Sequence, residues 1–137
     1  WLVHLAAHGT FRADSPLFSA VELADGPLTG YDLEQLHRSP HRVVLSSCSS
    51  AVSAPIGADE LLGLVGALVA RGCASVVASV VHVNDPATVP LMLSLHEHMD
   101  AGMPVPRALA AARAATRHGE AGSLAAVTAC AFVALGA

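Results

Sequence analysis

Two residues suited to nucleophilic chemistry, His8 and Cys48, lie 40 residues apart, and each follows an apolar run. A thiol attacks a carbonyl only as the thiolate, and a nearby histidine can take its proton or, as imidazolium, lower its pKa. Gly9 follows the histidine, and its N–H could face a developing oxyanion beside the N–H of Cys48. The pattern indicates a cysteine nucleophile. The alternative is a structural thiol, because free cysteines are among the most buried residues.

Both residues follow segments that we predict to be buried strands, 2–7 and 42–47. Continuous apolar strands alternating with helices predict an α/β fold with a mainly parallel sheet and helices on both faces. Functional residues of such sheets gather at the carboxyl ends of the strands. If the two strands are parallel neighbours, His8 and Cys48 meet at one edge of the sheet.

Hydrophobic periodicity and boundary residues predict the remaining elements. We expect strands at 18–23, 74–81 and 125–135, the first ending at the turn Asp25-Gly26, and a loop at 49–58. We expect helices after an N-cap at Thr29, over 59–71 with Gly72 as its stop, from Asp85-Pro86 to about 101, and from Met103-Pro104 to about 117.

The composition predicts a single domain over residues 1–137, with 13% charged residues and a net charge of −4. The basic residues form no stripe, which argues against nucleic acid as a partner. We find no apolar run of transmembrane length and no signal peptide, so we expect no membrane association. Three widely spaced cysteines form no disulfide framework and favour a cytoplasmic setting. Because Trp1 begins in the middle of a predicted strand, we expect a longer chain to precede it.

Several stretches in this order resemble the CHAT domain: HLAAHG at 4–9, PLFS at 16–19, VVLSSC at 43–48, GADE at 57–60 before an apolar helix, and GCASVVAS at 72–79. The resemblance covers nearly the whole chain. It implies a three-layer α/β/α caspase-like fold whose N-terminal part is missing here, and membership of the separase and caspase clan of cysteine proteases. It also implies that His8 and Cys48 are the catalytic dyad, at a spacing near that of caspases. Relatives usually follow helical repeats of the tetratricopeptide type, which we expect in the rest of the chain.

The sequence departs from the family pattern beside the proposed nucleophile and after the third strand. Ser49-Ser50 replaces the family's usual Glu-Thr, and His82 stands where a tryptophan is usual. We expect Ser46, His82 and Asp85 to contact substrate, with Asp85 able to select Arg or Lys. A helix N-cap is the alternative role for Asp85.

Other candidate residues have structural interpretations. We predict that Cys73 and Cys130 are inert core thiols and that His4 is a hydrogen-bonded core residue. His96 and His98 diverge on a helix, so we expect no metal site and no cofactor.

These observations favour a caspase-like cysteine endopeptidase that cleaves a protein or peptide. A catalytically inactive CHAT-like scaffold for protein–protein interaction is the alternative, because residues 49, 50 and 82 depart from the family.

Overall fold

A computed structural model describes residues 1–10, 12, 15–46, 58–81, 83–117 and 123–136. Four strands form its central sheet in the order β1-β5-β6-β7. These are β1 (Leu2–Leu5), β5 (Arg42–Leu45), β6 (Ser75–Ser79) and β7 (Phe132–Gly136). The first three run parallel, and β7 is antiparallel to β6. The sheet is therefore mainly parallel, as the alternation of elements predicts.

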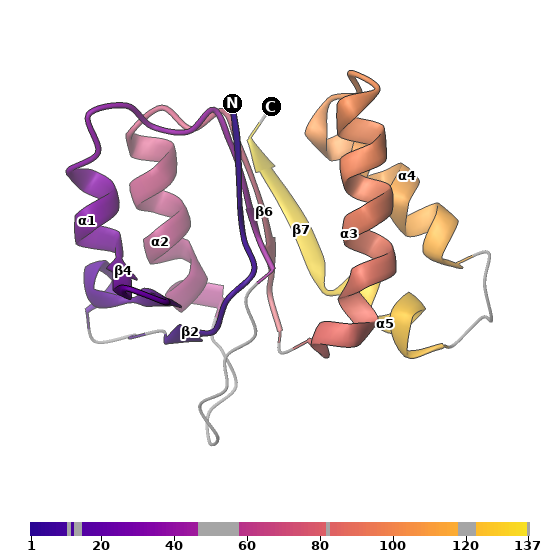
Figure 1. The fold of residues 1–137 in the computed structure, drawn as a ribbon, viewed down its shortest axis with the longest axis horizontal. Coiled ribbons are helices and arrows are strands. Elements are labelled where there is room, and N and C mark those ends of the chain that lie inside the picture. The colour runs from indigo at the N-terminus through magenta and orange to yellow at the C-terminus, as the bar shows by residue number, and fades with distance from the viewer. Residues whose placement is uncertain (11, 13–14, 47–57, 82, 118–122, 137) are drawn as a thin grey trace.

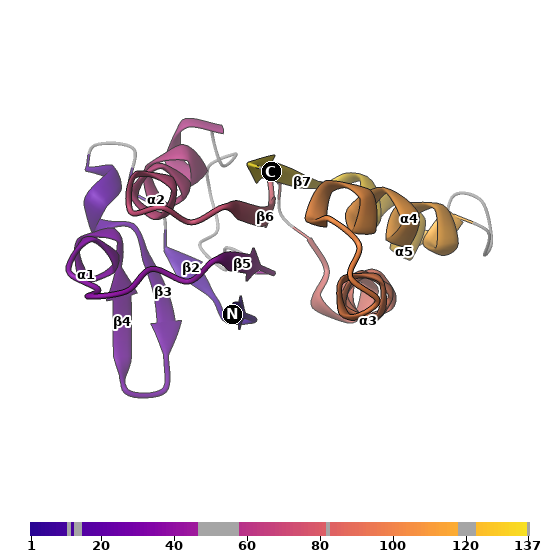
Figure 2. The same ribbon diagram turned by 90° about the horizontal axis from the view of Figure 1, so that it is seen from above.

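Helices cover both faces of this sheet (Figures 1 and 2). α1 (Gly30–Glu34) and α2 (Ala58–Ala70) lie on one face, and α3 (Asp85–Asp100), α4 (Val105–Arg117) and α5 (Leu124–Cys130) lie on the other. The β-branched residues of β5 and β6 point alternately into two cores: Val44 and Val77 toward α3 and α4, Val43 and Val76 toward α2. Val76 and Val77 are 0% exposed, so the sheet is the middle of three layers. This is the α/β/α architecture expected of a caspase-like fold.

A second, smaller sheet extends from the carboxyl end of β1. It contains β2 (Gly9–Thr10), β3 (Ala20–Leu23) and β4 (Gly26–Thr29), all antiparallel. The predicted strand 18–23 forms from residue 20, after a 3-10 turn, η1 (Pro16–Phe18). Gly26 has a φ of 132°, a conformation that favours glycine at the predicted turn. Thr29 caps α1 as predicted, because its hydroxyl accepts from the Asp32 N–H while the Asp32 carboxylate accepts from the Thr29 N–H.

The end of the chain differs from the prediction of one strand over 125–135. Residues 124–130 form α5, and only 132–136 form a strand. Ser123 caps the helix by accepting from the Ala126 N–H, and the segment is rich in alanine, the strongest helix former. Its apolar composition fits a buried strand or a helix equally well, which explains the wrong assignment. The predicted buried thiol at Cys130 is also wrong, because this residue is exposed on α5.

The start of α3 also needs a correction. Asn84, not Asp85, is the N-cap, and its side-chain oxygen accepts from the Ala87 N–H at 3.1 Å. Asp85 and Pro86 are the first two residues of the helix. The Asp85 carboxylate is therefore not needed as a cap.

None of the helices that the structure describes combines the length and the apolar character needed to cross a lipid bilayer.

Candidate active site

The carboxyl ends of β1 and β5 lie side by side. Leu5 is opposite Leu45, and the Ser46 N–H continues the ladder by donating to the Leu5 carbonyl at 3.1 Å. His8 comes three residues after Leu5, and Cys48 comes three residues after Leu45. The two strands are thus parallel neighbours, and His8 and Cys48 have the same sequence offset from the paired ends. Cys48 itself, with Ser49 and Ser50, lies outside the described residues.

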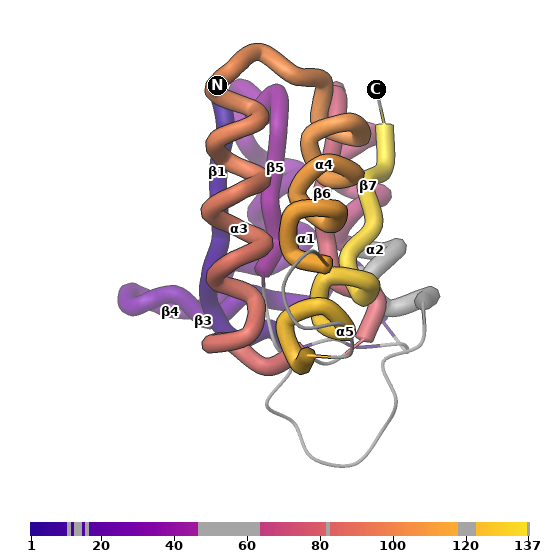
Figure 3. Tube along the Cα trace, turned by 90° about the vertical axis from the view of Figure 1, so that its right-hand side faces the viewer, coloured from indigo at the N-terminus to yellow at the C-terminus, as the bar shows by residue number. Residues whose placement is uncertain are grey.

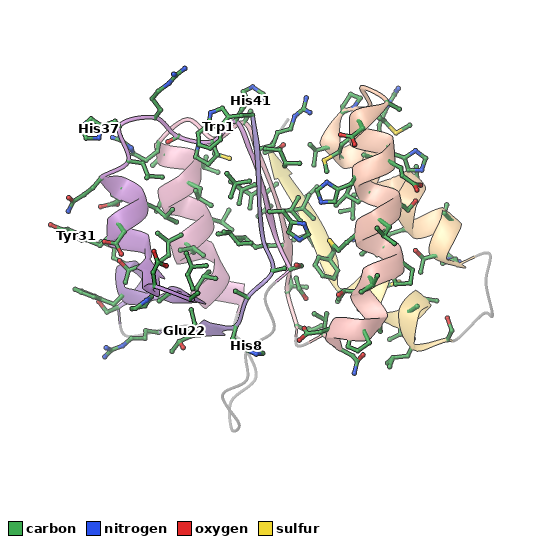
Figure 4. All side chains as sticks on the ribbon, viewed as in Figure 1. Trp1, His8, Glu22, Tyr31, His37 and His41 are labelled. Carbon is green, nitrogen blue, oxygen red and sulfur yellow. The ribbon has the colours of Figure 1, made fainter. Side chains whose placement is uncertain are left out.

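His8 is exposed and lies in the short link between β1 and β2. Its carbonyl accepts from the Glu22 N–H of β3 at 2.7 Å, so the small sheet fixes its backbone. Figure 4 shows His8 and Glu22 at the same end of the molecule, opposite Trp1 and His41. The small sheet therefore holds the imidazole at the carboxyl end of the large one.

Gly9 pairs with Val21 across β2 and β3. Positions of an antiparallel ladder alternate between hydrogen-bonded and non-hydrogen-bonded pairs. Because the Glu22 N–H bonds the carbonyl of His8, the pair of Gly9 and Val21 is non-hydrogen-bonded. The Gly9 N–H consequently points away from β3, and Gly9 itself is buried.

A cavity of about 450 Å³ opens at this edge of the sheet. Its lining includes residues from the ends of β1 and β5, from β3 and from the first half of α3: His8, Ser46, Glu22, Asp85, Thr88 and Met92. The structure thus brings three predicted site residues, His8, Ser46 and Asp85, around one space. His82 lies outside the described residues.

Glu22 and Asp85 give the cavity two carboxylates. They come from separate elements, β3 and α3, and both side chains are exposed. Asp85 also occupies the first turn of α3, where the helix dipole favours negative charge. Two carboxylates beside a cavity attract a cationic ligand group. Glu22 is absent from the prediction because nothing in its local sequence indicates that β3 reaches His8.

The cavity wall also contains a histidine that the sequence predicted to be structural. His4 is half-buried on β1 and lines the cavity, so its environment is partly that of a core residue. Its Nε2 lies 2.8 Å from the Ser46 Oγ, and its Nδ1 lies 2.9 Å from the Nε2 of His96 on α3. The prediction of a hydrogen-bonded histidine is confirmed. Burial first, and then the charge of His96, lower the pKa of His4.

The two described cysteines differ in their surroundings. Cys73 is buried, as predicted, and its thiol donates to the Ser75 carbonyl. Burial raises the pKa of the Cys73 thiol, so little thiolate forms there at neutral pH. Cys130 is exposed and outside the cavity lining.

Among the described residues, His, Cys, Asp and Glu side chains form no group of three or more that could hold a metal ion. The His96 side chain contacts His4 on β1. Among the described residues, no hydrogen bond joins the side chains of His96 and His98.

Comparison with known proteins identifies one family. The family model of the CHAT domain matches residues 1–130 of the chain. A search of the curated proteins finds no match.

Proposed function

Because the chain belongs to the CHAT domain family, we propose that it is a caspase-like cysteine endopeptidase domain with Cys48 as nucleophile and His8 as general base and acid. One observation carries this proposal. β1 and β5 are parallel and in register, and the cavity at their carboxyl ends is lined by His8. Cys48 follows Ser46, which lines this cavity, by two residues in the sequence.

The proposed reaction has two steps. His8 takes the Cys48 proton, and the thiolate attacks the scissile carbonyl carbon, whose oxygen becomes negatively charged. The N–H groups of Gly9 and Cys48 donate to this oxyanion. The tetrahedral intermediate collapses as the imidazolium of His8 protonates the leaving amine, which breaks the C–N bond and leaves a thioester. Water, deprotonated by His8, then attacks the thioester and releases the carboxylate and Cys48.

The orientation of Gly9 supports this assignment. Its N–H points away from β3, and a glycine permits close approach of a substrate backbone. His8 is exposed, so it can exchange protons with a bound peptide and with water.

The proposal is tested by a peptide carrying a thiol-reactive group, with labelling of each cysteine measured by mass spectrometry. We expect Cys48 to react fastest, because an adjacent histidine increases its thiolate fraction. Exposed Cys130 provides the reference for an unactivated thiol, and buried Cys73 should react slowest. His8→Ala should lower the Cys48 rate to that of Cys130. Equal labelling of Cys48 and Cys130 in the unchanged protein would instead favour the non-catalytic scaffold.

We also propose that the cavity binds the residue before the scissile bond and prefers arginine or lysine there. Asp85 and Glu22 supply two carboxylates, and the Ser46 hydroxyl contributes a polar group to the cavity wall. Asn84 caps α3, so the Asp85 carboxylate is available to a substrate, which supports this role. His82 stays a proposed substrate contact through the family resemblance alone.

Asp85→Asn is expected to lower kcat/KM for an arginine peptide by about tenfold to a hundredfold, the effect of losing one charged hydrogen bond. A matched peptide with norleucine in place of arginine should change little. Asp25→Asn, an exposed carboxylate in the turn between β3 and β4, is the control. The specificity proposal fails if Asp85→Asn lowers kcat/KM equally for both peptides.

A further inference from the structure

Three polar side chains form a continuous hydrogen-bonded chain from α3 to the sheet. His96 of α3 contacts His4 of β1, and His4 contacts Ser46 at the end of β5, through the two nitrogens of one imidazole. The His4 and His96 rings are stacked, with centroids 5.0 Å apart and planes 28° apart. Ser46 and His96 are 42 and 92 positions from His4 along the sequence, so the contacts join segments that no local structure connects.

The contact between His4 and His96 can hold only a limited number of protons. Between His4 Nδ1 and His96 Nε2 only one hydrogen fits at 2.9 Å, so one ring donates and the other accepts. One added proton is tolerated, because an imidazolium at either position still donates to a neutral partner. Two added protons would place two N–H groups against each other and break the contact. The lowered pKa of His4, caused by burial and by the charge of His96, agrees with this limit.

The contacts lie where α3 meets the proposed site. α3 runs in front of β1 and β5, while α4 lies in front of β6 and β7 (Figure 3). The first half of α3 supplies Asp85, Thr88 and Met92 to the cavity, whereas the strand ends supply His8 and Ser46. The two walls of the cavity are therefore connected through His96, His4 and Ser46.

We propose that His96, His4 and Ser46 are positioning residues that hold α3 against the ends of β1 and β5, and that this arrangement is lost when both histidines are protonated. The effect on catalysis rests on the proposed peptidase function. In neutral solution the hydrogen bonds among His96, His4 and Ser46 set the separation between the two cavity walls that carry Asp85 and His8. In acid the walls lose this connection, and the cavity binds its substrate more weakly.

Ser46 has the hydrogen bond of a nucleophile to His4, but its surroundings favour the positioning role. Its side chain is only 9% exposed, and its own N–H donates to the Leu5 carbonyl. That N–H is therefore not available to an oxyanion, as the N–H of an attacking residue often is.

Other ionisable groups lie at the cavity and on the elements that carry the pair or pack against it. They are His8, Glu22 and Asp85 at the cavity, Arg42 on β5, Glu97, His98 and Asp100 on α3, and Arg107, Arg113 and Arg117 on α4. Arg113 donates to the Ala129 carbonyl, so its guanidinium is directed toward α5. Because these groups also carry charge, the test needs a control variant on α3, the helix of His96. His98 lies on α3 and is buried to a similar extent.

The test compares three variants of the full chain. His96→Leu removes the hydrogen bond to His4, and His96→Gln keeps a hydrogen-bonding side chain that does not titrate. His98→Gln is the control. The equilibrium constant for unfolding in urea is measured from pH 8 to pH 5. The unfolded state binds protons below pH about 6.5, the ordinary pKa of histidine, whereas the native pair resists the second proton. Stability is therefore lost as pH falls below about 6.5, with the unfolding constant rising up to about tenfold per pH unit for one excess proton. Both His96 variants should make this dependence shallower, because they remove the charge of His96 while His4 stays half-buried, and His98→Gln should leave it unchanged.

Peptide kinetics supply the second measurement. His96→Leu should raise KM about tenfold at pH 7.5 with a smaller change in kcat, and His96→Gln should restore KM and remove its rise in acid. Nitrogen-15 spectra of the unchanged protein should show the pair binding one proton between pH 8 and pH 5. Two independent titrations near pH 6.5, or an unchanged unfolding profile in both His96 variants, would overturn the proposal. If no peptide is cleaved, the unfolding and spectroscopic results still decide whether His96, His4 and Ser46 form the proposed hydrogen bonds. Cysteine labelling separately tests the proposed peptidase function.

Discussion

Cys48→Ala is expected to abolish peptide cleavage, lowering kcat by about a thousandfold or more. Removal of a catalytic nucleophile has this effect because the remaining groups stabilise the oxyanion but form no acyl-enzyme. Substrate affinity should persist, since the cavity lined by His8, Ser46 and Asp85 is unchanged. Cleavage is measured by mass spectrometry of a peptide with one arginine, under conditions of substrate excess.

Cys130→Ala is the matched control for this experiment. Cys130 is an exposed thiol on α5 and is not part of the cavity lining, so its loss should leave kcat and KM unchanged. Full cleavage by the Cys48→Ala protein would show that another group attacks the substrate, or that the activity belongs to a contaminant. The first result would remove Cys48 from the mechanism, and the second would show that the measured cleavage does not belong to this domain.

His8→Ala is expected to lower kcat by about a hundredfold to ten thousandfold, the usual contribution of a general acid–base residue. KM should change little, because His8 acts on protons rather than on binding. The folded protein should keep its stability, since the His8 side chain is exposed and its structural bond to Glu22 uses the backbone carbonyl.

His37→Ala provides the control for the loss of an exposed imidazole. His37 follows α1 and is exposed, well separated in Figure 4 from the end of the sheet where His8 lies. If His37→Ala and His8→Ala lower kcat equally, the effect is not specific to the dyad. An unchanged kcat in His8→Ala would contradict the proposed proton transfers.

The sequence predicted those parts of the fold whose local pattern and tertiary environment agree. The β-branched runs at 42–47 and 74–81 contain the buried strands β5 and β6. Gly72 follows α2 with a φ of 89°, a conformation for which glycine is favoured at a helix end. The capping box between Thr29 and Asp32 also acts within four residues. In each case the determining interaction lies close along the chain.

Errors occurred where an apolar run or a polar residue has two local interpretations. The segment from Leu124 to Cys130 is apolar enough for a strand, but Ser123 and the alanine content favour a helix. Asn84 and Asp85 are adjacent and both able to cap, and the structure uses Asn84. The second assignment affects function, because it leaves the Asp85 carboxylate to the cavity.

The candidate site was predictable only to the extent that it follows from the topology of a parallel sheet. The rule that functional residues lie at strand carboxyl ends predicted that His8 and Cys48 meet there. The structure places His8 and Ser46 at the cavity at those ends, and Cys48 lies outside the described residues. Glu22 and His96 reach the same region from β3 and α3, through contacts that depend on three-dimensional packing. Their local sequences resemble those of ordinary surface residues, so sequence reasoning could not select them.

The central claim, a dyad of His8 and Cys48, is tested most directly by a crystal structure of the protein joined covalently to a peptidyl inhibitor. A bound inhibitor fixes the catalytic arrangement, so the distance from the nearest His8 ring nitrogen to the Cys48 sulfur is decisive. We predict a distance within about 4 Å, consistent with a hydrogen bond to sulfur or a close ion pair. A distance beyond about 8 Å, or an inhibitor attached to Cys130, would contradict the dyad.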